Sequence, residues 1–261
     1  MLSINLPARR LAGLALLIGV WMSPPAMRLS VAESAAGDAA FARSIVEKAD
    51  AVRFPQESFE VDVSVQTTVD GESAEKRVYR VLSKGNENTV VMVVEPASER
   101  GQIMLMRGRD LWLFLPDVSQ PVRLSLSQRL TGQVANGDLA RANFVGDYTP
   151  NLLRTETIDG ERFYVLELVA AGSGVTYSRV LYWVNQSNFF PYKAEFYSVS
   201  NRLLKTCQYE NFRSMAGRPR PTRLVMRDAL RKGEESILEY SGMKLRDLPD
   251  KIFNKDYLKR L

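Results

Sequence analysis

Two short apolar segments, at residues 103–106 and 111–115, place the strongest constraint on the fold of this chain. Only the four residues 107–110, which include Gly108, separate them, and this spacing predicts a tight β-hairpin. A strand with one face in water alternates apolar and polar residues, yet both segments are apolar on both faces. The hairpin must therefore be covered on each side. We expect a helix over one face and a cavity along the other.

Alternation along the two strands assigns each apolar side chain to a face. On this basis one face carries Met104, Met106, Trp112 and Phe114, and the other carries Ile103, Leu105, Leu111 and Leu113. We assign the first set to the cavity, because unbranched methionine and aromatic side chains suit a lining that adapts to flexible ligands.

Alternating segments at even spacing fill most of the remaining chain. They occur at residues 59–66, 76–82, 89–94, 121–124, 152–158, 163–169, 175–184, 192–199, 202–212, 222–230 and 235–246. Tight turns such as Asp70-Gly71 join neighbours, which indicates antiparallel hairpins. The pattern predicts one antiparallel sheet of about eleven or twelve strands, which is too large to stay flat. We therefore expect a mainly β fold with short helices, curled into a barrel or half-barrel.

Helical spacing occurs near the two ends of this sheet region. Residues 39–52 carry one apolar stripe behind a possible capping residue, Asp38, and residues 251–261 form a short amphipathic closing segment. The stripe consists of Phe41, Ile45, Val46, Ala49 and Val52. Because a helix of this kind buries its apolar face, the stripe must lie on the sheet.

Residues 125–148 interrupt the regular strands with a long irregular insertion. It contains three glycines and one short helical segment, residues 138–143, that begins at Asp138. Long insertions into a regular sheet are usually functional or mobile. We predict a loop with a short helix across the sheet, with Leu139 and Phe144 in a lid.

The first 32 residues have the features of a secretory signal peptide. Arg9 and Arg10 precede an apolar core at residues 11–22, and residues 30–32 offer a cleavage site of the small-x-small type. The apolar core is well short of the roughly 20 residues that span a bilayer. No cysteine directly follows it, so we expect an exported, periplasmic protein without a lipid anchor, with residues 33–261 as a single domain.

Charge is unevenly distributed along the chain. The net charge is +5, of which three arginines lie in residues 1–32; residues 213–261 carry +6 and residues 33–212 carry −4. A basic C-terminal region fits an anionic membrane surface or an acidic partner, although solvated strand faces explain most such counts. No motif for nucleic-acid recognition is present.

The residue inventory argues against an enzyme. The chain contains no histidine and one cysteine, Cys207, which excludes Ser-His-Asp and Cys-His sites and disfavours zinc. Ser73 and Lys76 fit the S-x-x-K spacing but lie in a predicted hairpin turn rather than a helix. We predict a binding protein without a metal or cofactor.

Apolar surface is the remaining candidate for function. The predicted cavity lining consists of Phe59, Val61, Val63, Val65, Val94, Met104, Met106, Trp112, Phe114, Leu139 and Phe144. Any one of these could be ordinary core, but a curled sheet with only short helices inside can leave an apolar cavity. Such a cavity suits acyl chains, since burying sixteen carbons yields on the order of 12 kcal/mol at about 0.8 kcal/mol per methylene.

An ordered series of motifs resembles the LolA-like outer-membrane lipoprotein-sorting family. It comprises Val94-Glu95-Pro96, residues 101–105, the run DLWLFLP at 110–116, Arg123, Gly137-Asp138-Leu139, residues 181–184, residues 190–195 and residues 252–258. The resemblance covers residues 59–261 and implies an eleven-stranded antiparallel half-barrel closed by helices around an apolar cavity. It also implies an arginine inside the cavity that holds a lid closed, at a position that the motifs do not fix.

Two functions are consistent with this resemblance. The first is a monomeric periplasmic carrier that receives the acyl chains of lipoproteins or other lipids and exchanges them with an inner-membrane transporter or an outer-membrane receptor. The second is a regulatory module that senses lipid and contacts an inner-membrane protein. Because the insertion at residues 125–148 marks a divergent branch, both lipoprotein and free lipid are open as cargo.

Overall fold

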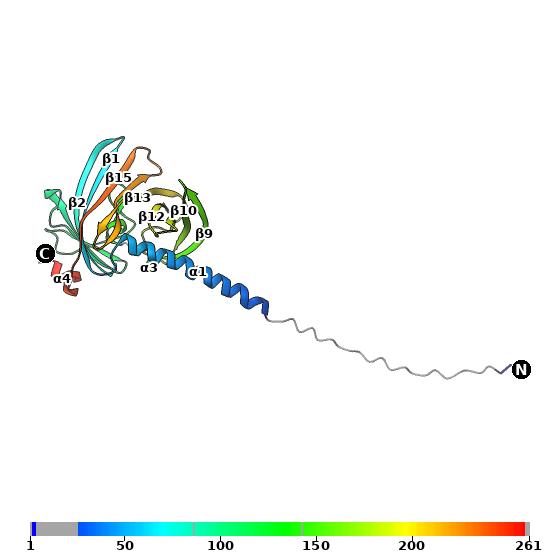
Figure 1. Cartoon of the computed structure of the whole chain (residues 1–261). Helices are drawn as coiled ribbons and strands as arrows, with labels where there is room; N and C mark the ends of the chain where they lie inside the picture. The colour runs from blue at the N-terminus through cyan, green and yellow to red at the C-terminus, as the bar shows by residue number, and fades with distance from the viewer. Residues whose placement is uncertain (1, 4–25, 86, 142, 259–261) are drawn as a thin grey trace.

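The computed structural model describes residues 2–3, 26–85, 87–141 and 143–258 (Figure 1). Most of the predicted signal peptide, including its apolar core at residues 11–22, lies outside these residues and stays a prediction. The predicted cleavage site at residues 30–32 falls within the first helix, α1 (Ala26–Arg53). Among the described residues, no helix is both long enough and apolar enough to cross a membrane.

One antiparallel sheet dominates the structure. Its strands are β1 (Phe59–Val69), β2 (Glu72–Lys84), β3 (Asn88–Glu95), β4 (Ile103–Arg107), β5 (Asp110–Phe114), β6 (Val122–Leu124), β9 (Tyr148–Ile158), β10 (Glu161–Ala170), β11 (Arg179–Asn185), β12 (Pro191–Tyr197), β13 (Leu203–Met215), β14 (Arg218–Asp228) and β15 (Glu234–Leu245). In space they follow the order β6-β5-β4-β3-β2-β1-β15-β14-β13-β12-β11-β10-β9.

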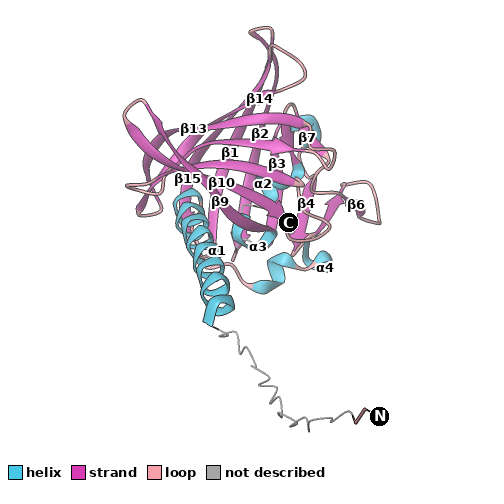
Figure 2. Ribbon diagram, turned by 90° about the vertical axis from the view of Figure 1, so that its right-hand side faces the viewer, coloured by secondary structure: helices cyan, strands magenta, loops and turns pink. Residues whose placement is uncertain are grey.

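The expected strand count of eleven is wrong, because this sheet has 13 strands. The short edge strand β6 pairs with β5 and extends the sheet at one end. The single antiparallel sheet is confirmed, and it curls strongly (Figure 2). It does not close by strand pairing, since β6 and β9 are its two ends.

The register of the β4–β5 hairpin corrects the predicted assignment of faces. Arg107 pairs with Asp110 across a two-residue turn that contains Gly108 at φ +58°, so facing residues have one odd and one even number. Met104 is opposite Leu113 and Met106 is opposite Leu111, whereas Ile103 faces Phe114 and Leu105 faces Trp112. Directly opposed residues share a face. Trp112 and Phe114 therefore do not lie with the two methionines.

The first helix is longer than predicted. α1 begins at Ala26, so Asp38 lies within it and does not cap it. Its buried stripe is Ala42, Ile45, Val46 and Ala49, whereas Phe41 is exposed and Val52 is only partly buried. This stripe packs against β9, β12 and β14. The N-terminal part of the helix projects away from the sheet (Figure 1).

The insertion at residues 125–148 folds into a small hairpin and two short helices, where one helix was predicted. β7 (Arg129–Thr131) pairs with β8 (Val134–Ala135), and α2 (Asn136–Ala140) and α3 (Phe144–Asp147) follow. The Asp138 carboxylate accepts a hydrogen bond from the backbone N–H of Ala135 at the start of α2, and the Asn143 side chain caps α3. Both helices lie within the hollow of the curled sheet (Figure 2).

Two apolar clusters lie on opposite faces of the β2–β5 region. The inner cluster fills the hollow and joins the sheet to α1, α2 and α3. The outer cluster is smaller and is covered by the C-terminal segment η2 (Asp250–Phe253) and α4 (Lys255–Leu258). The amphipathic closing segment predicted at residues 251–261 packs on this cluster through Ile252, Phe253 and Leu258.

Candidate functional site

The inner cluster contains most of the residues predicted to line a cavity. These are Phe59, Val61, Val63, Val65, Met104, Met106, Leu139 and Phe144, all of them buried. They come from β1, β4, α2 and α3, so the sheet and the insertion meet at this surface. That they bind a ligand stays a prediction.

The other three predicted residues lie elsewhere. Trp112 and Phe114 pack with the outer cluster, and Val94 and Phe114 border a groove on the outside of the sheet. Because of the hairpin register, these two aromatic residues cannot line the same space as Met104 and Met106. Their assignment to an inner lining is therefore corrected.

The hollow of the sheet is almost completely filled. Two cavities border the inner residues, one of about 10 Å³ beside Phe59 and Leu139 and one of about 30 Å³ beside Arg53 and Phe144. A single water molecule takes about 30 Å³ of liquid volume. An acyl chain therefore has no room in the hollow as the structure shows it, and the insertion would have to move to admit one.

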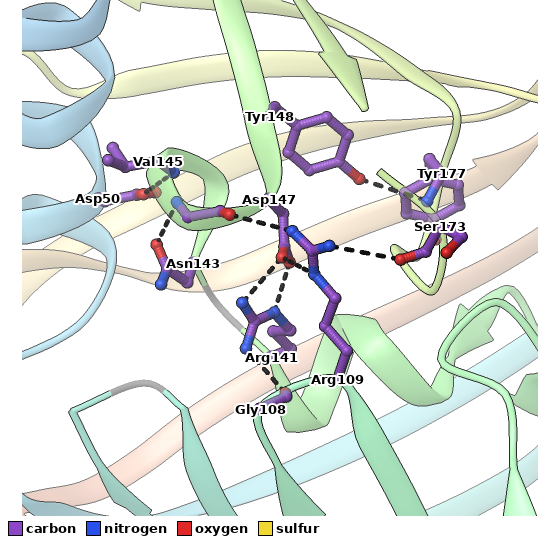
Figure 3. Close-up of polar contacts among 11 residues, drawn as sticks. Asp50, Gly108, Arg109, Arg141, Asn143, Val145, Asp147, Tyr148, Ser173 and Tyr177 are labelled. Carbon is purple, nitrogen blue, oxygen red and sulfur yellow. Dashed lines mark hydrogen bonds and ion pairs between the residues drawn. The ribbon is translucent and has the colours of Figure 1, made fainter. Parts of the chain in front are cut away.

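Side chains join the two ends of the sheet where strand pairing does not (Figure 3). Arg109, in the β4–β5 turn, donates to the Asp147 carboxylate of α3 at 3.1 Å and to the carbonyl of Ser173, in the β10–β11 loop, at 3.4 Å. Arg141 donates to the same carboxylate at 2.5 and 2.8 Å and to the Gly108 carbonyl at 2.9 Å. We call this arrangement the Asp147 tie.

The Asp147 tie is desolvated at its centre. The side chains of Arg141 and Asp147 are only 4% and 5% exposed, and Arg109 is 35% exposed. A buried carboxylate needs several donors to offset the loss of water. The two guanidinium groups supply them, and the Asp147 backbone carbonyl accepts a further hydrogen bond from Ala171 at 2.9 Å.

A second buried pair connects α1 to α3. The Asp50 carboxylate accepts from Arg53 at 3.0 Å and from the backbone N–H of Val145 at 3.0 Å. Burial raises the pKa of Asp50 from 3.8 to about 6, an effect that the Arg53 charge only partly offsets. The Arg53 guanidinium lies 4.0 Å from the centre of the Phe144 ring. Arg53 and Arg141 thus hold α3 from two sides.

A third buried pair holds α2. Lys205 of β13 donates to the Asp138 carboxylate at 2.5 Å and also to the Gln133 carbonyl. Tyr177 donates to Asp138 at 2.8 Å, and burial beside that carboxylate raises the pKa of Tyr177 well above its usual value. The whole insertion is therefore anchored by ion pairs as well as by apolar contacts.

The described residues contain no group of His, Cys, Asp and Glu side chains that could hold a metal ion. Cys207 is fully buried, and this burial raises the pKa of its thiol to about 12. A thiol with such a pKa is not a reactive nucleophile. The buried polar groups described above hold α2 and α3 in position through ion pairs and hydrogen bonds.

Sequence reasoning did not identify Asp50, Arg53, Arg109, Arg141 or Asp147. Asp50 and Arg53 could have been found, because they continue the buried helical stripe one turn beyond Val46 and Ala49. Charged residues on an apolar helix face signal a buried pair. Arg141 and Asp147 lie in irregular sequence, where no periodicity marks the inward side.

Comparisons with known proteins agree with this architecture. A family model described as "Uncharacterized protein" matches residues 85–260. The LolA superfamily protein NE2245 from Nitrosomonas europaea is 67% identical, with a TM-score of 0.80 over 83% of this chain and 98% of that chain. No curated protein matches the sequence.

Two further crystal structures share the fold at 22% identity and a TM-score of 0.72. One is a domain from Vibrio parahaemolyticus described as an outer membrane lipoprotein-sorting protein domain, covering 85% of this chain and 100% of that chain. The other is a DUF1329 family protein from Desulfovibrio piger, covering 85% of this chain and 99% of that chain.

Proposed function

Because the chain belongs to the LolA superfamily, we propose that it is a non-enzymatic periplasmic carrier that takes acyl chains of lipoproteins or other lipids into the hollow of its curled sheet. The family fold is one of binding and carrying, which supports the coarser part of this proposal. The cargo, the exchange between membranes and the partner membrane protein are the finer part. The proposed carrier can act between membranes only if the predicted signal peptide exports it.

The observation that carries the proposal is the way in which the sheet is closed. Its two ends are joined through the insertion by the Asp147 tie and not by strand hydrogen bonds. Ion pairs can dissociate and form again without unpairing strands of the sheet. The insertion can therefore act as a lid, and in this proposal Arg53, Arg109 and Arg141 hold it closed.

Opening of the lid would expose the surface that an acyl chain needs. Leu139 and Phe144 would leave the inner cluster with the insertion, and Met104, Met106 and the β1 valines would line the space. Burial of an acyl chain returns about 0.8 kcal/mol per methylene. A long chain thus offsets the loss of several side-chain contacts and ion pairs, whereas water does not.

A reversible lock on the lid tests this proposal. A β-carbon added at Gly137 of α2 would lie 3.0 Å from that of Thr176 in the β10–β11 loop. This is shorter than the roughly 3.5–4.5 Å typical of a disulfide, so the loop must move outward by a fraction of an ångström to form the bond. The double variant Gly137→Cys/Thr176→Cys should form a disulfide that links α2 covalently to the β10–β11 loop. We expect the oxidised protein to lose uptake of a fluorescent fatty acid into the hollow, and reduction to restore it.

The single variant Thr176→Cys is the matched control, because it carries a thiol without the lock, whereas Gly137→Cys alone would place its β-carbon 2.0 Å from the Thr176 hydroxyl oxygen. Cys207 is buried and should not interfere. Equal uptake into the hollow by the oxidised and reduced double variant would overturn the proposal. Transfer of labelled lipid between vesicles then separates the carrier from a lipid-sensing module, since a sensor binds lipid but does not move it.

A further inference from the structure

A large hollow lies on the outside of the sheet, not within it. It has a volume of about 850 Å³, within the range of roughly 300–1,000 Å³ that is typical of small-molecule sites. Its floor is a row of directly paired residues across four strands: Arg80, Met92, Ile103 and Phe114. We call it the outer groove.

The groove exists because the C-terminal segment covers only part of an apolar stripe. The neighbouring row, formed by Leu82, Val90, Leu105 and Trp112, lies in the same outer cluster as Leu248 and Phe253. Leu258 ends this cover and forms one border of the groove. Beyond it, Met92 and Phe114 are only partly buried.

The remaining borders come from two loops. Residues 100–102 precede β4 and residues 115–119 follow β5, so apolar floor and polar rim meet along the groove. A long apolar floor that opens to solvent on one side suits a chain-like ligand, whose head group stays in water.

The charged groups that face the groove are two arginines and one aspartate. Arg80 is paired, since it donates to both oxygens of Asp62 at 2.8 and 3.0 Å. Arg100 makes only long contacts, of 3.3 and 3.4 Å, to the Val94 carbonyl and has no carboxylate partner among the described residues. Asp117, which also borders the groove, likewise forms no ion pair with any described residue.

We propose that the outer groove binds a single-chain amphiphile, with its acyl chain along Met92, Ile103 and Phe114 and its anionic head group at Arg100. An oxyanion is the complementary partner for a guanidinium that lacks a carboxylate. A fatty-acid carboxylate and a lysophospholipid phosphate share this chemistry. The site is separate from the hollow of the sheet, because the sheet itself lies between them.

The oxidised lid-locked variant allows this groove to be tested without the hollow. In that protein a photoactivatable palmitate should label peptides that contain Met92, Phe114 or Leu258. Arg100→Ala should weaken binding about tenfold, and Asp117→Asn should strengthen it by removing a like charge. Arg123→Ala is the matched control, because Arg123 is exposed, pairs with Asp110 and lies outside the groove.

Three ligands distinguish the head groups. Palmitate and lysophosphatidylglycerol should both bind more tightly than neutral monopalmitoylglycerol, and the tighter of the two identifies the preferred oxyanion. Labelling confined to peptides of the inner cluster, or equal binding of the neutral ligand, overturns the groove while leaving the carrier proposal intact. If the groove is labelled but the reduced variant takes up no fatty acid into the hollow, the carrier proposal is overturned and the groove is supported. No labelling anywhere overturns both.

Discussion

The two faces of the β4–β5 hairpin are similarly apolar but are covered in different ways. The inner face carries Met104 and Met106, which are sealed beneath the insertion. The outer face carries Ile103 and Phe114, which border an open groove beyond the C-terminal segment. One cover is complete and includes buried ion pairs, and the other is partial and combines apolar contacts with exposed charges such as the pair of Lys84 with Asp250.

The two covers differ in whether buried ion pairs are added to the apolar contacts. Apolar contacts and ion pairs occur in both covers, but only the ion pairs of the inner cover are buried, so that their desolvation offsets much of their attraction. Such pairs contribute little net stability compared with apolar replacements, yet they fix one geometry and are severely destabilising when half removed. The carrier proposal requires two states of the inner cover, closed and open, and makes no such requirement of the outer cover.

The largest effect should come from breaking the Asp147 tie. Asp147→Ala would leave Arg141 buried without a carboxylate, and removing one partner of a buried pair typically costs about 3–5 kcal/mol. Urea denaturation measures the change in free energy of unfolding. We also expect faster uptake of fatty acid, since the lid loses its connection to both Arg109 and Arg141.

The double variant Arg141→Met/Asp147→Leu provides the control for this change. It removes both charges together, so most of the lost stability should return while the lid stays closed by apolar contacts. If Asp147→Ala were less than about 1 kcal/mol destabilised, the tie would be no more than a surface pair and the two-state interpretation of the inner cover would be wrong.

Truncation of one residue on each face compares the two covers directly. Met106 is fully buried, and Met106→Ala should cost about 2–5 kcal/mol because it opens a cavity in the inner cluster. Phe114 is partly exposed in the groove, so Phe114→Ala should cost less despite removing more atoms. Equal losses in urea denaturation would mean that the outer groove is as well covered as the inside.

The alternating pattern predicted where the strands lie, but not which side chains share a face. Most strands of the sheet fall on segments with period two, β4 and β5 fall on the two fully apolar segments, and tight turns such as Asp70-Gly71 made antiparallel pairing predictable. The face assignment of Trp112 and Phe114 depended on whether the hairpin turn contains an even or an odd number of residues. A single residue in the turn reverses every side chain of the second strand.

The charged anchors were harder to predict than the apolar core. Burial of valines on β1 follows from their alternation, whereas Arg109 and Asp147 become neighbours only because the curl of the sheet brings the β4–β5 turn to α3. Contacts of this kind depend on the three-dimensional path of the chain. Asp50 and Arg53 are the exception, since helical spacing alone places them on the buried stripe.

The inner cover should also respond to pH through Asp50. Its pKa is raised from 3.8 to about 6, so between these values the folded protein keeps a proton that the unfolded chain has lost. Stability contributed at this site therefore falls as the pH rises from about 4 to about 6. The free energy of unfolding of the wild type, relative to that of Asp50→Asn, should fall by about 2–3 kcal/mol over this range. Parallel pH profiles for the two proteins would contradict the raised pKa.

The smallest effect concerns the cover of the outer face. Lys255 of α4 lies 3.6 Å from the centre of the Trp112 ring and holds the C-terminal segment over it. Lys255→Ala should cost only about 0.5–1 kcal/mol and make Trp112 fluorescence easier to quench with acrylamide. Lys251→Ala is the matched control, since Lys251 lies beside Tyr257 instead. If both variants left Trp112 equally protected, Lys255 would not hold this cover, which would then depend on the apolar contacts of Phe253 and Leu258 and on the exposed pair of Lys84 with Asp250. The two faces would still differ, because the ion pair of Arg141 with Asp147 in the inner cover is buried, whereas Asp250 in the outer cover is 90% exposed.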